Sequence, residues 1–483
     1  MKNRIKGLKV VVVFVLCLVM VAGCASDEIG NKENIESVAT MEAEESKAVS
    51  FGFIGGKDVM PITGYYGPFH SYQSTDGNAF PNYVSDEYMK MIADAGLNMI
   101  VYNDLSYART PELAETYLDL ADKYGLGIFV NDTKITGYAG KTDISPAELA
   151  EQIARYADHD CFCGMYLIDE PGAAYYEPGN GKRLISRYVE LADVLHNDLG
   201  LITYINMFPI WDYEIKKESY EKYVKEVCES LNPKVLMWDM YPFDSAEGAK
   251  EGYQVYFYNM NLIREYSKKM HIPFWAFIQA GHQWNDAKEK FDSKLPYYPN
   301  ESQFQWNVNT SLAFGAQGIQ YFPILQPEHF AYAKSTEWDF QRNGLIGANG
   351  NKNQWYYYAQ NINKHIAAID EVLMNSVHKG IIITSEQAQT DMELAMSCVI
   401  ESGEFQELLS VTGDAMVGCF NYSGKTALYV VNYDMEHAQN ITLNLNTTHD
   451  VKVIQNTETS YVNAKNLKLD MAAGEGVLVV IEQ

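Results

Sequence analysis

Basic residues are scarce in this chain of 483 residues. It carries 37 Lys and Arg against 63 Asp and Glu, which gives a formal net charge of −26 at pH 7. Binding to nucleic acid depends on clustered Lys and Arg that neutralise phosphates, so this composition argues against a nucleic-acid partner. An acidic surface favours solubility in an exposed compartment.

Motifs for bound metals and nucleotides are also missing. The seven cysteines include no CxxC pair, and no GxGxxG or GxxxxGK[ST] sequence follows an expected strand. Outside the first 24 residues five cysteines remain, an odd number, so neither a disulfide framework nor a structural zinc site is indicated. We therefore expect no metal and no cofactor, and we expect Cys161 and Cys163 to be small buried residues of one strand.

The first 24 residues have the pattern of a secretion signal. Four basic residues precede the apolar run Val10–Ala22, which is too short to span a bilayer comfortably. The run ends in Val-Ala-Gly-Cys, which resembles the lipobox of bacterial lipoproteins. The resemblance implies that Cys24 is lipidated and anchors the protein to the membrane at the extracellular face of the bacterial cell. An ordinary secretory signal with a chance cysteine is the alternative.

Residues 25–50 contain no aromatic residue and seven acidic ones. Such a segment cannot bury enough apolar surface to offset its ordering entropy, so we expect a flexible tether. A flexible chain of that length reaches about 25–30 Å.

Short β-rich runs alternate with helical stretches over the next 310 residues or so, which is the signature of parallel βα units. Eight units predict a (β/α)8 barrel, the TIM-barrel fold, whereas an open doubly wound sheet needs fewer strands. The expected strands are residues 62–66, 98–102, 127–130, 164–168, 201–205, 235–239, 273–278 and 318–322.

Helix signals fill the gaps between these runs. Residues 112–124 carry apolar side chains at helical spacing and stop at Gly125. Ser145, Pro146 and Glu148 have the order of a helix N-cap, a first-turn proline and a capping-box acid.

The pattern changes after Ser376 to short strands separated by turn residues, near 380–384, 427–433, 441–445 and 477–481. This predicts a small antiparallel β-sandwich. The expected organisation is a signal peptide (1–23), a tether (24–50), a barrel domain (51–375) and a β-sandwich domain (376–483).

Polar residues at the carboxyl ends of barrel strands face one shared site. Here those ends carry carboxyl, amide and hydroxyl groups, with no lysine and no histidine cluster: Asn103, Asp104, Asp132, Asp169, Glu170, Asn206, Asp239, Tyr241 and Gln279. A metal hydrolase would want several histidines or carboxylates converging as ligands, and a Schiff-base enzyme would want a lysine at a strand end. Paired carboxyls suit glycoside hydrolysis, with one acid for the leaving oxygen and one anion for the oxocarbenium-like transition state.

Aromatic residues accompany these strand ends, and sugar rings pack their C–H faces on aromatic planes. For the two tryptophans inside expected strands, core packing and substrate contact are equally reasonable, whereas Trp211 and Trp284, in loops past strand ends, favour the site. The expected substrate-binding set is Tyr65, Tyr66, Asn103, Asp132, Asn206, Trp211, Trp238, Trp275, Gln279 and Trp284.

The sequence at residues 166–171, Tyr-Leu-Ile-Asp-Glu-Pro, resembles the Asn-Glu-Pro motif that closes strand four in the large clan of barrel glycosidases related to cellulases and β-galactosidases. Residues 314–322 are similar to that clan's approach to strand eight. The resemblance implies that Glu170 is the general acid/base. Two positions depart from the pattern: Asp169 replaces the Asn, and Gln279 occupies the place of the nucleophilic Glu on strand seven.

The adjacent Asp169 and Glu170 are also similar to the Asp-Glu pair of β-hexosaminidase-type families. There the substrate's own 2-acetamido group attacks, the Asp orients it, and a Tyr holds its oxygen, a role that would fall to Tyr241. An acidic pair that merely stabilises the next helix N-terminus is the structural alternative.

The sequence therefore predicts a glycoside hydrolase of extracellular oligo- or polysaccharides. Glu170 is the expected acid/base, and the second group is either Asp169 acting through the substrate or Asp239 acting directly. The alternatives are a non-catalytic carbohydrate-binding lipoprotein on the same barrel and, less consistent with eight even units, a two-lobed solute-binding protein.

Overall fold

The computed structural model describes residues 59–70, 82–101, 103, 105, 110–136, 145–171, 188–198, 201–210, 213–243, 249–281, 299–325 and 344–482. All of them belong to one compact unit. Cys24 and the proposed signal and tether lie outside these residues, as do Asp104, Trp211 and Trp284. Among the residues described, no helix combines the length and the apolar character that crossing a bilayer requires.

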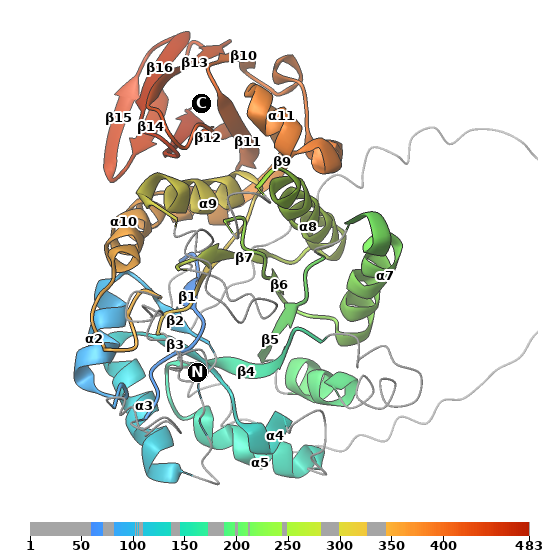
Figure 1. Ribbon diagram of the computed structural model, residues 1–483, viewed down its shortest axis with the longest axis vertical. Coiled ribbons are helices and arrows are strands. Elements are labelled where there is room, and N and C mark those ends of the chain that lie inside the picture. The colour runs from blue at the N-terminus through green and yellow to red at the C-terminus, as the bar shows by residue number, and fades with distance from the viewer. Residues whose placement is uncertain are drawn as a thin grey trace, which may run out of the picture. The chain divides into compact units, whose positions relative to one another are not determined.

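Eight parallel strands form the first sheet, in the order β1-β8-β7-β6-β5-β4-β3-β2 (Figure 1). Backbone bonds from Val101 N to Gly64 O, and from Asn98 N to Ile62 O, join β2 to β1 and close the ring. The strands are β1 (Ile62–Gly64), β2 (Met99–Ile100), β3 (Gly127–Val130), β4 (Phe162–Asp169), β5 (Ile202–Met207), β6 (Leu236–Trp238), β7 (Phe274–Gln279) and β8 (Ile319–Phe322). The predicted barrel is confirmed.

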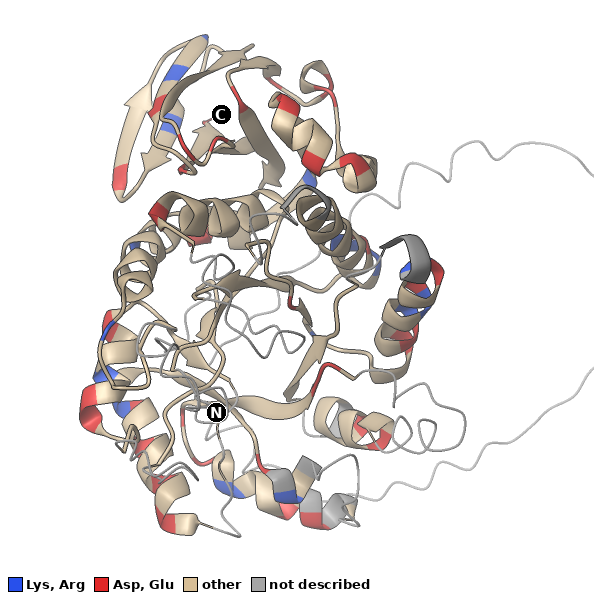
Figure 2. Ribbon diagram, viewed as in Figure 1, with Lys and Arg blue, Asp and Glu red and all other residues tan. Residues whose placement is uncertain are grey.

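Helices pack around the outside of this ring (Figure 1). They are α2 (Asp86–Asp94), α3 (Pro111–Tyr124), α4 (Thr133–Thr136), α5 (Pro146–Tyr156), α7 (Tyr213–Leu231), α8 (Ala249–Met270), α9 (Glu301–Ala313) and α10 (Gln354–Met374), with a short π-helix η3 (Val194–Asp198). Acidic and basic residues are mixed along their outer faces (Figure 2).

The local signals explain where two of these helices begin and end. Helix α3 starts with a proline and ends at Gly125, whose φ of 65° suits glycine. Helix α5 carries the predicted capping box, in which Ser145 and Glu148 satisfy each other's backbone N–H groups.

Two antiparallel sheets follow, as the sequence predicted. One has the order β10-β13-β16 and the other β15-β14-β17-β12-β11-β9, and apolar residues from both form one core. The strands are β9 (Ser376–Ile383), β10 (Leu408–Thr412), β11 (Ala415–Tyr422), β12 (Lys425–Asn432), β13 (Gln439–Leu445), β14 (Val451–Gln455), β15 (Glu458–Val462), β16 (Asn466–Met471) and β17 (Gly476–Ile481), with helix α11 (Glu386–Asp391) and two 3₁₀ turns, η6 (Glu393–Cys398) and η7 (Ser402–Glu404), between β9 and β10.

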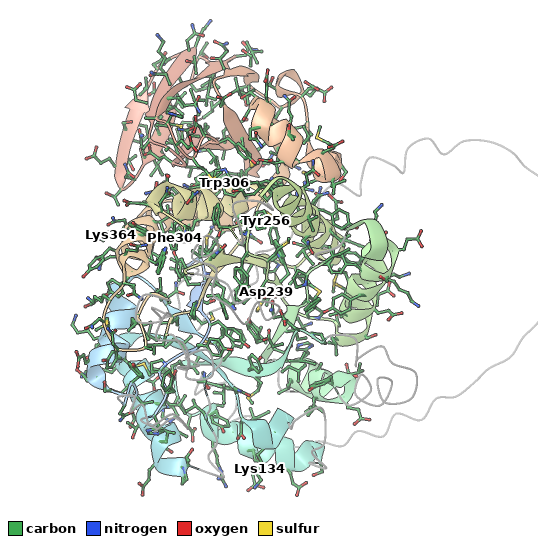
Figure 3. All side chains as sticks on the ribbon, viewed as in Figure 1. Lys134, Asp239, Tyr256, Phe304, Trp306 and Lys364 are labelled. Atoms are coloured by element: carbon green, nitrogen blue, oxygen red, sulfur yellow. The ribbon has the colours of Figure 1, made fainter. Side chains whose placement is uncertain are left out.

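Helix α9 lies between the barrel and the second of these sheets and is buried on all sides over its last eight residues. The side chain of Asn309 accepts a hydrogen bond from Tyr429 on β12 (2.7 Å) and donates one to the backbone O of Gly474 (2.8 Å). Trp306 of the same helix contacts the ring of Tyr256 (Figure 3). It also contacts the ring of Tyr433. The helix thus serves both domains as core.

Candidate active site

Two neighbouring strand ends, on β4 and β5, carry the central polar residues of the barrel. A bulge in β4 between Tyr166 and Ile168 shifts the register, so that Asp169 pairs with Asn206 on β5. Without that extra residue, alternation from the inward-facing Tyr166 would turn Asp169 away from the barrel interior. The bulge therefore turns the Asp169 carboxyl into the site.

Asn206 connects two carboxyls at the centre of the site. Its Nδ2 donates to Asp169 Oδ1 (2.9 Å) and to Asp239 Oδ1 (2.8 Å). Asp239 follows β6 directly and lies within the ring of strands in Figure 3. A further hydrogen bond joins the carboxyls of Asp239 and Glu170. The three acidic residues thus form one connected network.

Tyrosines extend the network toward β1. Tyr65 donates to Asp169 Oδ2 (2.7 Å), and its hydroxyl also lies 2.9 Å from that of Tyr166. Tyr166 stacks on Tyr204, whose hydroxyl accepts a bond from Gln320 (2.6 Å). Burial raises the pKa of Asp169 above its usual value, and the hydrogen bonds that its two oxygens accept from Tyr65 and Asn206 oppose this shift.

Glu170 has an unusual backbone. Its φ of 42° is left-handed, a conformation that costs a residue other than glycine about 1–2 kcal/mol. Its N–H donates to the backbone O of Asn206 (2.9 Å), which holds the turn. Strained residues of this kind cluster at functional sites. Tyr66, at the end of β1, has a similar φ of 60° and packs against Tyr65 and Phe322.

Burial and like charge determine the protonation of this network. The side chain of Glu170 reaches solvent, but protein atoms crowd its carboxyl, and this desolvation together with the Asp169 charge raises its pKa to about 7. Burial raises the pKa of Asp239 well above its usual range, and the charges of Glu170 and Asp169 act in the same direction. Asp239 therefore stays protonated, and it donates this proton in its hydrogen bond to Glu170.

Tyr241 lies next to these groups, as predicted. Burial raises its pKa well above the ordinary tyrosine value, and the three carboxyls add to the shift, so its hydroxyl stays protonated. Its ring packs on Phe277 and Phe322. The structure thus brings together Asp169, Glu170, Asn206, Asp239 and Tyr241, with Tyr65 beside them.

Gln279, at the end of β7, is engaged with backbone. Its Oε1 accepts from Phe243 N (3.0 Å), and its Nε2 donates to the carbonyls of Phe243 (3.2 Å) and Gly281 (3.0 Å). Both N–H donors are used in holding the chain that follows β6. The structure therefore gives this residue a scaffold contact where the sequence predicted a substrate contact.

Asn103 and Asp132 also have scaffold contacts. The Asn103 side chain donates to Phe129 O (2.8 Å) and accepts from Asn131 N (3.1 Å), which links the end of β2 to that of β3. Asp132 accepts bonds from Tyr156 OH (2.5 Å) and Lys134 N (2.9 Å) at the start of α4. Neither contact reaches the carboxyl network.

The two strand tryptophans fill the core. Trp238 is 1% exposed and packs against Tyr256 of α8, on the outer side of the barrel wall. Trp275 is equally buried inside the barrel but near the amino end of β7, where it contacts Phe129. These placements do not support the prediction that Trp238 and Trp275 contact a ligand. Strand alternation turns Trp238 to the outer face at the end of β6, and Trp275 lies near the amino end of β7.

Phe208 was not predicted. It follows β5 directly, two residues after Asn206, and 41% of its surface is exposed, which is unusual for a large apolar residue at this end of the barrel. Its position directly after an expected strand is the sequence feature that could have identified Phe208 as a candidate site residue.

In the described part of the chain, the clusters of side chains that could hold a metal ion lie away from the carboxyl network. Two groups share His159, one with Asp122 and Cys161 and one with Glu115 and Asp119. They lie around α3 and the segment before β4, at the opposite end of that strand from Asp169.

No family model and no curated protein matches this chain. Among solved structures, it is similar to a β-galactosidase from Bacillus circulans sp. alkalophilus, with a TM-score of 0.54 and 10% identity over 88% of this chain and 99% of that one. A GH42 β-galactosidase from G. stearothermophilus gives 0.53 and 9% over 88% and 98%. A β-galactosidase from the psychrophilic Marinomonas ef1 gives 0.44 and 11% over 70% of this chain and 65% of its own length. The first two similarities show a glycosidase-like fold.

Proposed function

We propose that this protein is a glycoside hydrolase in which Glu170 is the general acid/base. The observation that carries the proposal is the connected network of Asp169, Asn206, Asp239 and Glu170 at the carboxyl ends of β4, β5 and β6. In a barrel this is the end where catalytic groups lie. The substrates would be extracellular oligo- or polysaccharides. Two classes should be tested: β-galactosides, because of the fold similarity, and 2-acetamido sugars, because of the adjacent Asp169 and Glu170.

The pKa of Glu170 suits this role. A general acid works best when its pKa lies near the working pH, and a value of about 7 leaves a large protonated fraction at neutrality. The protonated carboxyl can then donate to the leaving glycosidic oxygen, and the carboxylate can activate water in the second step.

The second group remains a choice between Asp169 and Asp239, and the hydrogen bond between Asp239 and Glu170 favours Asp169. Two carboxyls in direct contact are closer than the roughly 5–5.5 Å that a retaining pair needs for direct attack. Asp169, which accepts bonds on both oxygens, can stabilise positive charge near the anomeric carbon. From this arrangement we infer substrate assistance by a 2-acetamido group, and Tyr241 is the residue that would hold the acetamido oxygen.

The experiment is Glu170→Gln, which keeps the shape of the side chain and removes the proton. We expect kcat to fall by about 10²–10⁴ on glycosides with poor leaving groups and by less on activated aryl glycosides, which need little protonation. Glu115→Gln, an exposed glutamate on α3, is the matched control. Unchanged turnover of natural glycans by Glu170→Gln would rule out this assignment.

A carbohydrate-binding protein without catalysis is the second candidate. It is favoured by Gln279, because the strand-seven position that would hold a nucleophile instead bonds to backbone. Calorimetric binding of glycans by the wild-type protein, without release of product over days, would establish this alternative.

We further propose that Cys24 carries a lipid anchor that holds the protein outside the cell. The support is the order of basic, apolar and Val-Ala-Gly-Cys residues. We expect wild type in the membrane fraction and Cys24→Ala in the soluble or secreted fraction. Cys17→Ala, within the same apolar run, is the control, and equal distribution of all three would contradict the anchor.

A further inference from the structure

We propose that the side-chain carbonyl of Asn206 accepts a hydrogen bond from the bound sugar and so selects among sugars by the donor they carry. This inference rests on the proposed function of the same site and names a specificity residue within it. The support comes from the orientation of the amide, its burial and the chemistry of its neighbours.

The orientation of the Asn206 amide is fixed. Its two N–H bonds point at Asp169 Oδ1 (2.9 Å) and Asp239 Oδ1 (2.8 Å). Rotating the amide by half a turn would place its oxygen against two carboxyl oxygens and leave both without a donor. The carbonyl oxygen must therefore point away from both.

That oxygen has no hydrogen-bond partner among the residues that the structure describes. Asn206 is only 1% exposed, and a buried carbonyl without a donor costs about 1–3 kcal/mol. Native proteins keep such a group where a ligand or an ordered water completes it. The residue lies at the end of β5, between the strands that carry Asp169 and Asp239.

The side-chain carbonyl oxygen of Asn206 needs a hydrogen-bond donor, and the neighbouring groups that the structure describes do not supply one. Asp169 and Asp239 accept bonds from this amide, and the backbone O of Asn206 accepts from Glu170 N. A group that enters must therefore bring a donor, and a sugar hydroxyl or the N–H of a 2-acetamido group meets that need. A sugar that lacks the donor at this one position leaves the carbonyl unpaired, and the site should reject it.

The experiment measures binding in the Glu170→Gln background, so that turnover does not interfere. The probes are methyl β-glycosides of galactose, glucose and N-acetylglucosamine, and analogues in which one hydroxyl at a time is replaced by hydrogen or fluorine, or the acetamido group by acetoxy. We expect one position at which the substitution weakens binding about 10-fold to 100-fold. In Asn206→Ala that same substitution should weaken binding by less than about two-fold, because the acceptor has gone.

Asn206→Ala also removes the donors that hold the two aspartates, so Asn206→Ser serves as a second variant, and the melting temperature of each is measured first. Asn259→Ala is the matched control. Asn259 is a fully buried asparagine that bonds to the backbone of Ile210, and its loss should leave every ratio between analogue and parent sugar unchanged.

The outcomes separate this inference from the proposed function. If Asn206 only positions carboxyls, both Asn206 variants will weaken all sugars by one common factor, and the inference is overturned. Selective coupling without hydrolysis by the wild type would keep the inference and refute the hydrolase. If the wild type hydrolyses glycans and the Asn206 variants weaken the binding of all sugars equally, the hydrolase stands and the inference falls. If no probe binds, the inference is overturned.

Discussion

At the scale of single residues, the protonation of Glu170 depends on its immediate neighbour. Burial is the largest cause of its raised pKa, the negative charge of Asp169 adds to it, and the hydrogen bond from Asp239 opposes both. Asp169 is the last residue of β4, Glu170 follows it directly, and Asp239 directly follows β6. The pH dependence of activity is therefore a direct readout of the network.

We predict that Asp169→Asn shifts the alkaline limb of the pH profile to lower pH. The limb reports loss of the Glu170 proton at a pKa of about 7, and removal of a like charge makes that proton easier to lose. The measurement is kcat/KM against pH on a glycoside with a poor leaving group, because its cleavage needs the Glu170 proton. Asp132→Asn, a buried carboxyl at the end of β3, is the control and should leave the limb in place. A limb that stays fixed or rises in Asp169→Asn would contradict the network.

The sequence was sufficient to predict which residue types gather at the strand ends, because that follows from strand order alone. It predicted Asp169, Glu170, Asn206, Asp239 and Tyr241, which the structure brings together. It could not give the hydrogen-bond partners. The bulge in β4 that turns Asp169 inward depends on the neighbouring strand, and no local pattern signals it.

At the scale of elements, one side chain at the end of β7 holds the segment that follows β6. Gln279 on β7 bonds to both backbone groups of Phe243 and to the carbonyl of Gly281. This chain follows β6 and contains Tyr241 and Asp239. The glutamine therefore supports the site from behind, a role that strand position alone could not distinguish from substrate contact.

We predict that Gln279→Glu destabilises the protein and does not create a nucleophile. An oxygen in place of Nε2 would face two carbonyl oxygens in a buried site, which should lower the free energy of unfolding by at least about 2 kcal/mol. Urea denaturation measures this, alongside turnover. Gln303→Glu is the matched control, because a capping-box glutamate accepts the same backbone bond from Asn300 that Gln303 accepts. A stable Gln279→Glu variant with increased activity would show that the position is catalytic.

Strand tryptophans illustrate a second limit at this scale. The expected strand 235–239 was close to β6, but its inward and outward faces were not assigned, and Trp238 lies on the outer face against α8. Trp275 faces inward, but it lies near the amino end of β7, too far along the barrel to reach a ligand at the carboxyl ends. Residue type alone cannot distinguish core packing from substrate contact for these two tryptophans, because a tryptophan ring suits both.

At the scale of the whole molecule, the succession of a βα barrel and a β-rich tail was predictable from periodicity. The two sheets of the tail and their strand order were not, because antiparallel pairing such as β17 between β12 and β14 joins segments far apart in the sequence. The same holds for helix α9. Its length and capping residues are readable, but its burial on all sides depends on strands such as β12, which begins more than 100 residues later.

A helix that serves as core for two domains leaves neither of them able to melt alone. Calorimetry should therefore record one transition, with calorimetric and van't Hoff enthalpies in agreement. Gly474→Ala, in the β-domain, places a Cβ 2.2 Å from Ser302 O at a φ of 68°, and should lower the temperature of that one transition without splitting it. Gly424→Ala, with φ 87° but no atom within 4 Å, is the control for backbone strain alone and should lower it less. Two separated transitions would mean that the barrel survives without its neighbour. One transition means that a protease cut anywhere in the β-domain shortens the lifetime of the carboxyl network, although that domain contributes no residue to it.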